Sequence, residues 1–258
     1  YMTKQLDSFK KVISHAKEYG FIFPSSEIYD GLSAVYDYAQ NGVELKNNIA
    51  DRWWREMTQI HENIVGLDSG ILMHPKIWEA SGHVGEFHDP LVDCKQCKAR
   101  YRADELSDNI ENEEWDKMKC PNCGTTGKMT SPRQFNLMFK TQVGPVEDTG
   151  SVAYLRPETA QGIYVNYQLV QGSTRMKIPF GIAQIGKAFR NEIIARNFIF
   201  RTREFEQMEM QYFVKPGSDN ESMSEWKEKR FNFYIDTLGI DKNNIRFHQH
   251  GDGELAHY

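Results

Sequence analysis

Apolar side chains recur with helical spacing in two segments near the start of the sequence. The first segment, residues 4–19, ends before Gly20 and carries six apolar positions: Leu6, Phe9, Val12, Ile13, Ala16 and Tyr19. The second segment, residues 44–60, carries a single apolar stripe: Leu45, Ile49, Trp53, Met57 and Ile60. The spacing predicts two amphipathic helices, and a glycine at position 20 is typical of a helix end. Trp54 lies off the second stripe, so it either contacts another element or subunit or stays partly exposed.

Residues 180–214 alternate in polarity and predict two strands joined by a short turn-like stretch. On the second strand one face carries apolar side chains: Met208, Met210, Tyr212 and Val214. The other face is polar but includes one aromatic ring: Arg203, Phe205, Gln207, Glu209 and Gln211. On the first strand Gly186 and Ala188 leave room above the sheet, and longer polar residues border that room: Gln184, Arg190 and Glu192. The pattern is typical of an antiparallel hairpin with one solvated face, or of a hairpin that binds a flat, anionic ligand.

The chain of 258 residues has an ordinary globular composition, with 40% apolar and 26% charged residues. Its formal net charge of −5 produces no global positive field, so any contact with nucleic acid needs a local basic patch. No apolar run approaches the length of a membrane span, and we expect no membrane partner. The cysteines all belong to two CxxC pairs, which favours a reducing, cytoplasmic location.

The two pairs are separated by residues 98–119 and supply four candidate metal ligands: Cys94, Cys97, Cys120 and Cys123. Four thiolates can close tetrahedrally around zinc, and such a closed site is structural rather than catalytic. Disulfides or four free thiols are the alternative. The lobe between the pairs is acidic, so we expect bound metal rather than a core of its own to supply its folding energy. The preceding loop-rich stretch, residues 66–88, contains histidines whose spacings fit no compact ligand pair: His74, His83 and His88.

Residues 131–155 again have strand-like alternation and lead into the hexapeptide RPETAQ, residues 156–161. Pro157 suits the first position of a helix whose buried stripe would be Ile163, Tyr167 and Val170. Glu158 would then lie in the first helical turn. An acid there either complements the helix dipole or points into the room above the hairpin and holds a cation.

Several stretches together resemble the class II aminoacyl-tRNA synthetases, and among them the homodimeric glycyl-tRNA synthetases. They are YLRPETAQGIYVNY, the hairpin FRNEIIARNFIFRTREFEQMEMQYF, which resembles the family's motif 2, the CxxC module with RYRAD beside it, and GELAHY. The resemblance covers nearly the whole chain. It implies an α+β fold in which helices flank an antiparallel sheet, with a small zinc-ribbon-like insertion. The expected division is residues 1–93 and 129–258 for the catalytic domain and residues 94–128 for the zinc-binding insertion.

The resemblance also implies roles for individual residues. Arg190 is the expected catalytic residue, because its forked guanidinium suits the α-phosphate of ATP and the amino acid carboxylate. Phe205 would stack on adenine, and Glu158 would bind the glycine ammonium. The expected ATP-binding set is Arg190, Asn191, Glu192, Phe200, Arg201, Thr202, Arg203, Glu204, Phe205, Glu254 and Leu255. The expected glycine-binding set is Arg102, Glu158, Phe205, Glu206, Gln207, Met208 and Glu209.

By this resemblance the protein would be a glycine–tRNA ligase that forms glycyl-adenylate, using ATP, Mg²⁺ on the phosphates and a structural Zn²⁺. Its partners would be glycine, tRNA(Gly) and a second copy of the chain. The alternative is a non-catalytic synthetase-like accessory or nucleic-acid-binding protein on the same scaffold. A free-standing zinc-ribbon RNA binder would explain only residues 94–123.

Two departures from the family pattern bear on these expectations. The motif 1 stretch reads YDYAQNG, residues 36–42, where relatives usually have YDYGPLG, which leaves the geometry at the dimer interface open. In the family, motif 3 and the anticodon-binding domain lie beyond the position that corresponds to Tyr258. We therefore expect residues 1–258 alone to be inactive.

Overall fold

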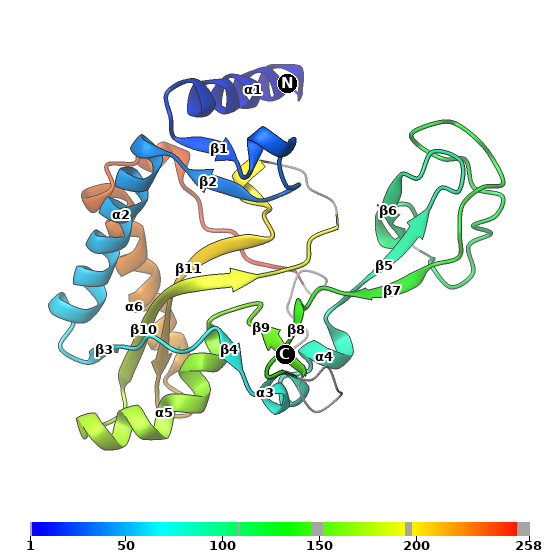
Figure 1. The fold of residues 1–258 in the computed structure, drawn as a ribbon. Coiled ribbons are helices and arrows are strands. Elements are labelled where there is room, and N and C mark those ends of the chain that lie inside the picture. The colour runs from blue at the N-terminus through cyan, green and yellow to red at the C-terminus, as the bar shows by residue number, and fades with distance from the viewer. Residues whose placement is uncertain (1, 108, 146–151, 194–197, 252–258) are drawn as a thin grey trace.

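The computed structural model describes residues 2–107, 109–145, 152–193 and 198–251, and Figure 1 shows their arrangement. The first helix, α1, spans Met2–Glu18 and ends before Gly20, whose φ of +67° is a conformation that favours glycine. Next, β1 (Ile22–Pro24) pairs antiparallel with β2 (Tyr36–Tyr38), and a 3-10 turn over Glu27–Tyr29 lies between them. The helix predicted over residues 4–19 is therefore confirmed.

The second predicted helix is α2, Gln40–Arg55, which continues as a π-helical turn over Glu56–Ile60. Trp53 and Met57 from its apolar stripe are buried, whereas Leu45 and Ile60 are exposed. Trp54 packs against β3 (Ile64–Gly66), since a Cβ added at Gly66 would lie 2.4 Å from its ring. Trp54 therefore contacts another element of this chain, which was one of the two interpretations of its position.

The hairpin predicted over residues 180–214 forms the centre of the fold. β10 (Phe180–Phe189) and β11 (Glu204–Phe213) pair antiparallel along their full length. β3 pairs in parallel with the other edge of β10, which gives the sheet order β11-β10-β3. A 3-10 turn over Phe198–Phe200 precedes β11, and residues 194–197 of the connection lie outside the described part of the chain.

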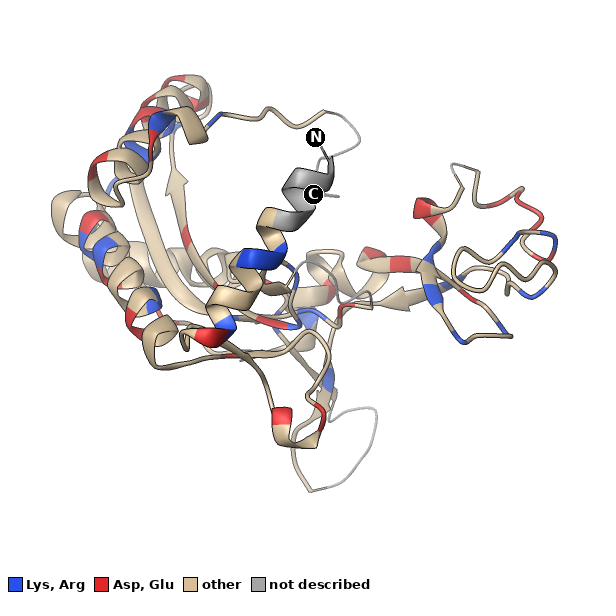
Figure 2. Ribbon diagram, turned by 90° about the horizontal axis from the view of Figure 1, so that it is seen from above, with Lys and Arg blue, Asp and Glu red and all other residues tan. Residues whose placement is uncertain are grey.

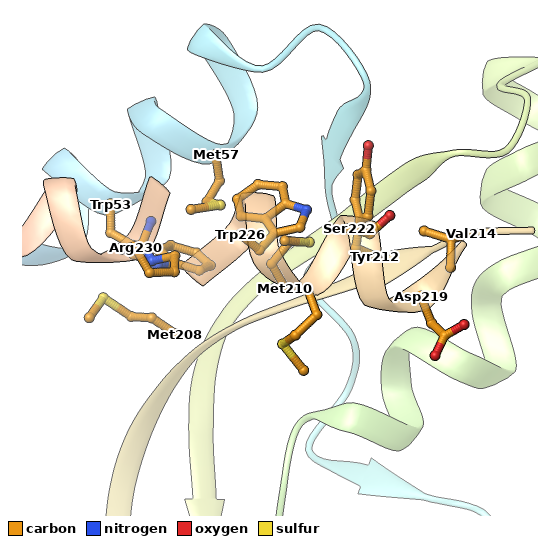
Figure 3. A pocket seen from close by; sticks show the side chains of 11 residues that line it. Trp53, Met57, Met208, Met210, Tyr212, Val214, Asp219, Ser222, Trp226 and Arg230 are labelled. Carbon is orange, nitrogen blue, oxygen red and sulfur yellow. The ribbon is translucent and has the colours of Figure 1, made fainter. Parts of the chain in front are cut away.

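The apolar face of the hairpin packs against helices, as the alternation predicts. Its residues Ala183 and Met210 join one core cluster with side chains from other elements: Trp53, Met57, Ile64 and Phe233. The helix beside α2 is α6, Asp219–Asn232, which continues as a π-helical turn over Phe233–Thr237. A pocket of about 420 Å³ remains behind β11, and Figure 3 shows the methionine and tryptophan side chains that line it.

The polar face of the hairpin is covered at one end by α5, Ala160–Thr174. Ile163 of α5 is fully buried against Phe180 and Ile182, and Tyr167 and Val170 extend the contact, so the predicted stripe is confirmed. The prediction that Pro157 begins this helix is wrong, because Thr159 is the N-cap and Ala160 the first helical residue. Residues 156–158 thus run as non-helical backbone along the face that α5 leaves open.

Residues 66–93 contain more regular structure than the sequence suggested. β4 (Leu72–Met73), α3 (Pro75–Ala80) and α4 (His83–Glu86) all lie in this stretch. β4 joins β9 (Val152–Leu155) and β8 (Lys140–Gln142) in a sheet of order β4-β9-β8. Trp78 of α3, fully buried against Met138 and Tyr154, anchors the short helix, which the loop-like sequence pattern did not reveal.

A lobe projects from this body along β5 (His88–Asp93) and β7 (Arg133–Asn136), and β6 (Arg100–Arg102) completes its sheet (Figure 1). Figure 2 shows charges of both signs spread over it. Contrary to expectation, the lobe has a small core of its own around Trp115, which packs with Val92, Ala103 and Met129. These apolar residues are far apart in sequence and follow no period, so the pattern gave no signal for them.

Short 3-10 turns also occur over Ala103–Glu105 and Lys242–Asn244. Within the described part of the chain, no helix is both long enough and apolar enough to cross a membrane.

Candidate active site

Glu158, Arg190 and Phe205 meet on the polar face of the hairpin, at the end that α5 leaves open. Arg190 follows β10, and its guanidinium lies 5.3 Å from the ring centroid of Phe205 on β11. A terminal nitrogen of Arg190 lies 3.9 Å from Glu158 Oε2, and its Nε donates to the Pro157 carbonyl at 3.1 Å. Arg190 therefore lies next to both Glu158 and Phe205, and the roles of the three side chains toward a ligand stay predictions.

The carboxylate of Glu158 is buried, with 7% of the residue exposed, and is held on one side by two groups. Gln161 Nε2 donates to Glu158 Oε1 at 2.7 Å, and His83 Nε2 lies 3.5 Å from the same oxygen. His83 is 1% exposed, lies edge-on to Trp78 and places Nδ1 2.9 Å from Ser81 Oγ. From its spacing alone His83 could be weighed only as a metal ligand, because nothing in the local sequence shows that α4 brings it to Glu158.

The polar residues farther along β11 hold the segment that carries Glu158. Gln207 Oε1 accepts from the Thr159 backbone N–H at 3.1 Å, and Glu209 Oε2 accepts from the Thr159 hydroxyl at 2.5 Å. Gln211 donates to Glu209 in turn. Gln207 and Glu209 were both expected at the glycine site, and here their side chains position the residue next to Glu158.

A fully buried arginine lies against the polar face of β10. Arg156 is 1% exposed, and its Nε donates to the Lys187 carbonyl at 2.6 Å while Nη1 donates to the Ser69 carbonyl at 2.8 Å. Burial lowers the pKa of Arg156. A Cβ at Gly186 would lie 2.2 Å from Arg156 Nη2. Sequence analysis read Gly186 as leaving space for a ligand, whereas the structure fills that space with this guanidinium.

A cavity of about 510 Å³ borders Arg190 and Phe205. Its lining contains most of the expected ATP-binding residues: Arg190, Glu192, Phe200, Arg201, Thr202, Glu204 and Phe205. Glu192 pairs with Arg201 at 2.9 Å and accepts from Arg203 Nε through its backbone carbonyl at 3.0 Å. The backbone N–H of Asn191 donates to the Leu137 carbonyl at 2.8 Å. This hydrogen bond fixes the end of β10 to the segment between β7 and β8.

Arg102, at the end of β6, pairs with two carboxylates. Its Nη1 pairs with Asp89 Oδ1 at 2.9 Å and its Nη2 with Asp104 Oδ2 at 2.6 Å. Asp89 is 5% exposed, and burial raises its pKa although Arg102 acts in the opposite direction. The negative charge of Glu192 raises the same pKa further. The Asp89 carboxylate therefore interacts electrostatically with the hairpin as well as with the lobe.

Glu206 and Met208, which were expected at the glycine site, lie on the other face of β11. Alternate residues of a strand point to opposite sides, and these two fall on the side of α2. Glu206 pairs with Lys46 of α2 at 3.0 Å and also lines the cavity beside Arg190, and Met208 lines the pocket of Figure 3. The roles of these two residues toward glycine stay predictions. Glu254 and Leu255, expected at the ATP site, lie outside the described residues.

The four cysteines of the lobe converge on one point. Their sulfur atoms all lie within 4.8 Å of one another, and the Cys94–Cys123 and Cys97–Cys120 Sγ separations are 3.8 and 3.7 Å. Tetrahedral zinc with Zn–S bonds of about 2.3 Å requires sulfur separations of about 3.8 Å. All four are free thiols, and the backbone N–H of Cys123 lowers the pKa of Cys120 to about 6, which favours the thiolate. The donor set therefore fits zinc.

Residues 139–254, which include the hairpin, α5 and Glu158, match the family model described as "tRNA synthetase class II core domain (G, H, P, S and T)". The chain belongs to the class II aminoacyl-tRNA synthetase family. Among solved structures, this class II synthetase chain is similar to the RNA binding domain of threonyl-tRNA synthetase from Cryptosporidium parvum Iowa II. The TM-score is 0.52 at 19% identity, over 85% of this chain and 40% of that one, which indicates a shared fold.

Within the family, this synthetase chain is similar to glycine–tRNA ligases over nearly all of its residues. It is 61% identical to the glycine–tRNA ligase of Treponema denticola over 252 residues, which are 97% of this chain and 54% of the relative. It is 58% identical to that of Borreliella burgdorferi strain ZS7 over 249 residues, which are 96% of this chain and 54% of the relative. The chain thus spans about half the length of the curated relatives it matches.

Proposed function

We propose that the protein is a glycine–tRNA ligase, of which residues 1–258 form the part that binds glycine and ATP. The observation that carries this proposal is that Arg190 lies near both Glu158 and Phe205 and lines, with Phe205, a cavity of about 510 Å³. A buried carboxylate, a half-buried guanidinium and an aromatic ring are complementary to an ammonium group, a phosphate and a base, respectively. The high identity to glycine–tRNA ligases supports the same function.

In the first step the glycine carboxylate attacks the α-phosphorus of ATP, pyrophosphate leaves in line with the attack, and glycyl-adenylate forms. Arg190 would neutralise the charge that develops on the α-phosphate, because its terminal nitrogens reach the cavity beside Phe205. Phe205 would hold the adenine ring. In the second step the terminal hydroxyl of tRNA(Gly) attacks the activated carbonyl and releases AMP. This chemistry needs no nucleophilic side chain and depends on positioning and charge neutralisation.

Magnesium would neutralise the phosphates in the first step, and the carboxylates of Glu192 and Glu204 at the cavity are oxygen donors of the kind it binds. Zinc would be structural and held by the four cysteines of the lobe, since their separations match a closed tetrahedral site. We assign the lobe to a zinc-binding insertion, residues 94–128, and the flanking residues 1–93 and 129–258 to the catalytic domain.

Selectivity for glycine requires a site that excludes any side chain on the α-carbon. The surroundings of Glu158 suit this, because His83 and Gln161, which contact its carboxylate, are both buried, as is the adjacent Thr159. Binding energy then comes from the ammonium group rather than from side-chain contacts, and a larger amino acid is rejected by overlap. We also propose a homodimer and a cytoplasmic location, as the resemblance implies.

The test is glycine-dependent exchange of pyrophosphate into ATP by the full-length protein. We expect exchange with glycine and a much lower rate with alanine at the same concentration. If a folded, zinc-loaded protein showed no exchange with glycine, the proposal would be wrong, and the alternative of a non-catalytic accessory protein would gain support.

A further inference from the structure

Gln161, in the first turn of α5, is a buried residue beside Glu158 to which neither the sequence nor the resemblance gave a role. It is 7% exposed, and its Nε2 donates to Glu158 Oε1 at 2.7 Å. An ionised carboxylate can only accept hydrogen bonds, so the amide must present its nitrogen to Glu158. This contact fixes the orientation of the amide. The amide oxygen, Gln161 Oε1, therefore points away from Glu158 Oε1.

The amide oxygen of Gln161 has no hydrogen-bond partner among the described residues. A buried acceptor without a partner carries a desolvation cost that a ligand donor can remove. Because the two amide heteroatoms are bonded to one carbon, this oxygen is separated from the carboxylate of Glu158 by the width of one amide group. The site thus contains an acceptor next to the group proposed to bind the substrate's ammonium.

The two oxygens of Glu158 have different surroundings. Oε1 receives the amide of Gln161 and lies 3.5 Å from His83 Nε2, so protein groups hold it from two sides. Oε2 lies toward Arg190, whose nearest terminal nitrogen is 3.9 Å away, beyond hydrogen-bond distance. Gln161 and His83 therefore hold Oε1, and Oε2 is the oxygen on the side of Arg190.

We propose that Gln161 is a further substrate-binding residue, whose Oε1 accepts one N–H of the glycine ammonium while Glu158 Oε2 accepts another. This inference rests on the proposed function. An ammonium group has three donors, so a single carboxylate oxygen leaves it undersatisfied in a buried site. The amide supplies a neutral second acceptor and, through its nitrogen, keeps Glu158 in place for the first.

The experiment is pyrophosphate exchange by the full-length protein with Gln161→Met, which keeps the side-chain length but removes both hydrogen-bonding groups. Loss of a hydrogen bond to a charged group should raise KM for glycine about 10- to 100-fold, with KM for ATP changed about twofold or less. The matched control is Gln168→Met, an exposed glutamine on the same helix, which should leave both constants unchanged. Thermal unfolding of each variant shows whether it folds.

A competitor without the ammonium separates contact from a merely structural effect. Glycolate replaces the ammonium of glycine with a hydroxyl group, so its inhibition constant should change much less than KM for glycine in Gln161→Met.

The outcomes separate the two proposals. If the wild-type protein exchanges pyrophosphate with glycine but Gln161→Met leaves KM for glycine unchanged, or weakens glycolate and glycine equally, the role of Gln161 is wrong and the proposed function stands. If the wild-type protein shows no exchange with glycine, the proposed function fails and the role of Gln161 fails with it.

Discussion

Replacing Gly186 with alanine should destabilise the protein, because the added methyl group would overlap a buried guanidinium. A Cβ at this position would lie 2.2 Å from Arg156 Nη2 and 3.2 Å from its Cζ. The end of an arginine side chain usually moves aside at little cost. Here it cannot do so freely, because Arg156 is 1% exposed and donates to the carbonyls of Lys187 and Ser69.

The magnitude follows from two contributions. Overpacking a filled site by one methyl group costs about 1–3 kcal/mol. Moving the guanidinium by more than about 1 Å, to restore an ordinary contact distance, also breaks or stretches at least one hydrogen bond from a charged group, worth about 1.5–3 kcal/mol. We therefore expect Gly186→Ala to lower the free energy of unfolding by about 3 kcal/mol.

Urea unfolding of the full-length protein, followed by tryptophan fluorescence and circular dichroism, measures this loss. The matched control is Gly172→Ala in α5, where an added Cβ meets no atom within 4 Å. Alanine favours a helix more than glycine does, so this control should stabilise the protein by about 0.5–1 kcal/mol. If Gly186→Ala unfolds at the same urea concentration as the wild type, Arg156 is not a fixed, buried group and the reasoning is refuted.

Three further predictions concern the site and the lobe. Glu158→Ala should abolish glycine-dependent pyrophosphate exchange while ATP binding stays measurable by calorimetry, because only the glycine ammonium loses its anionic partner. Glycine activation that survives this substitution would contradict the assignment of Glu158 to the glycine ammonium. Elemental analysis should find about one zinc per chain, and Cys120→Ser should lose it and make the lobe sensitive to protease; a metal-free wild-type lobe that resists protease would refute the site. Asp89→Asn should raise KM for glycine more than Asp104→Asn does. Both aspartates hold Arg102, but the Asp89 side chain is 8% exposed and the Asp104 side chain 39%, so loss of the buried partner should displace Arg102 more. Equal effects of the two substitutions would show that burial of the Arg102 partner is unimportant.

The sequence predicted the central hairpin well because strand alternation is a local property. Met210 on one face and Phe205 on the other differ in parity, and parity alone assigns them to opposite sides. The same rule shows why a contiguous motif is an imperfect guide to a site. Residues 205–209 were assigned to glycine as a block, and their side chains alternate between faces: Glu206 pairs with Lys46 of α2, whereas Gln207 and Glu209 bond to Thr159.

Other features depend on contacts between residues that are distant in the chain. His83 contacts Glu158 because α4 lies next to the segment that precedes α5. No local sequence pattern predicts that contact. Arg156 fills the space above Gly186 because the chain before α5 crosses β10 at that point. The core around Trp115 likewise assembles from positions with no common period.

By itself the sequence determined which residues could carry the chemistry: the CxxC pairs, the hairpin and the carboxylate of Glu158 are all visible as residue types at short spacings. Only the tertiary structure decided how Glu158 is used, with one oxygen held by Gln161 and His83 and the other turned toward Arg190. The physical reason is that burial and hydrogen-bond partners are set by packing between separate elements. Periodicity and spacing describe only one element at a time.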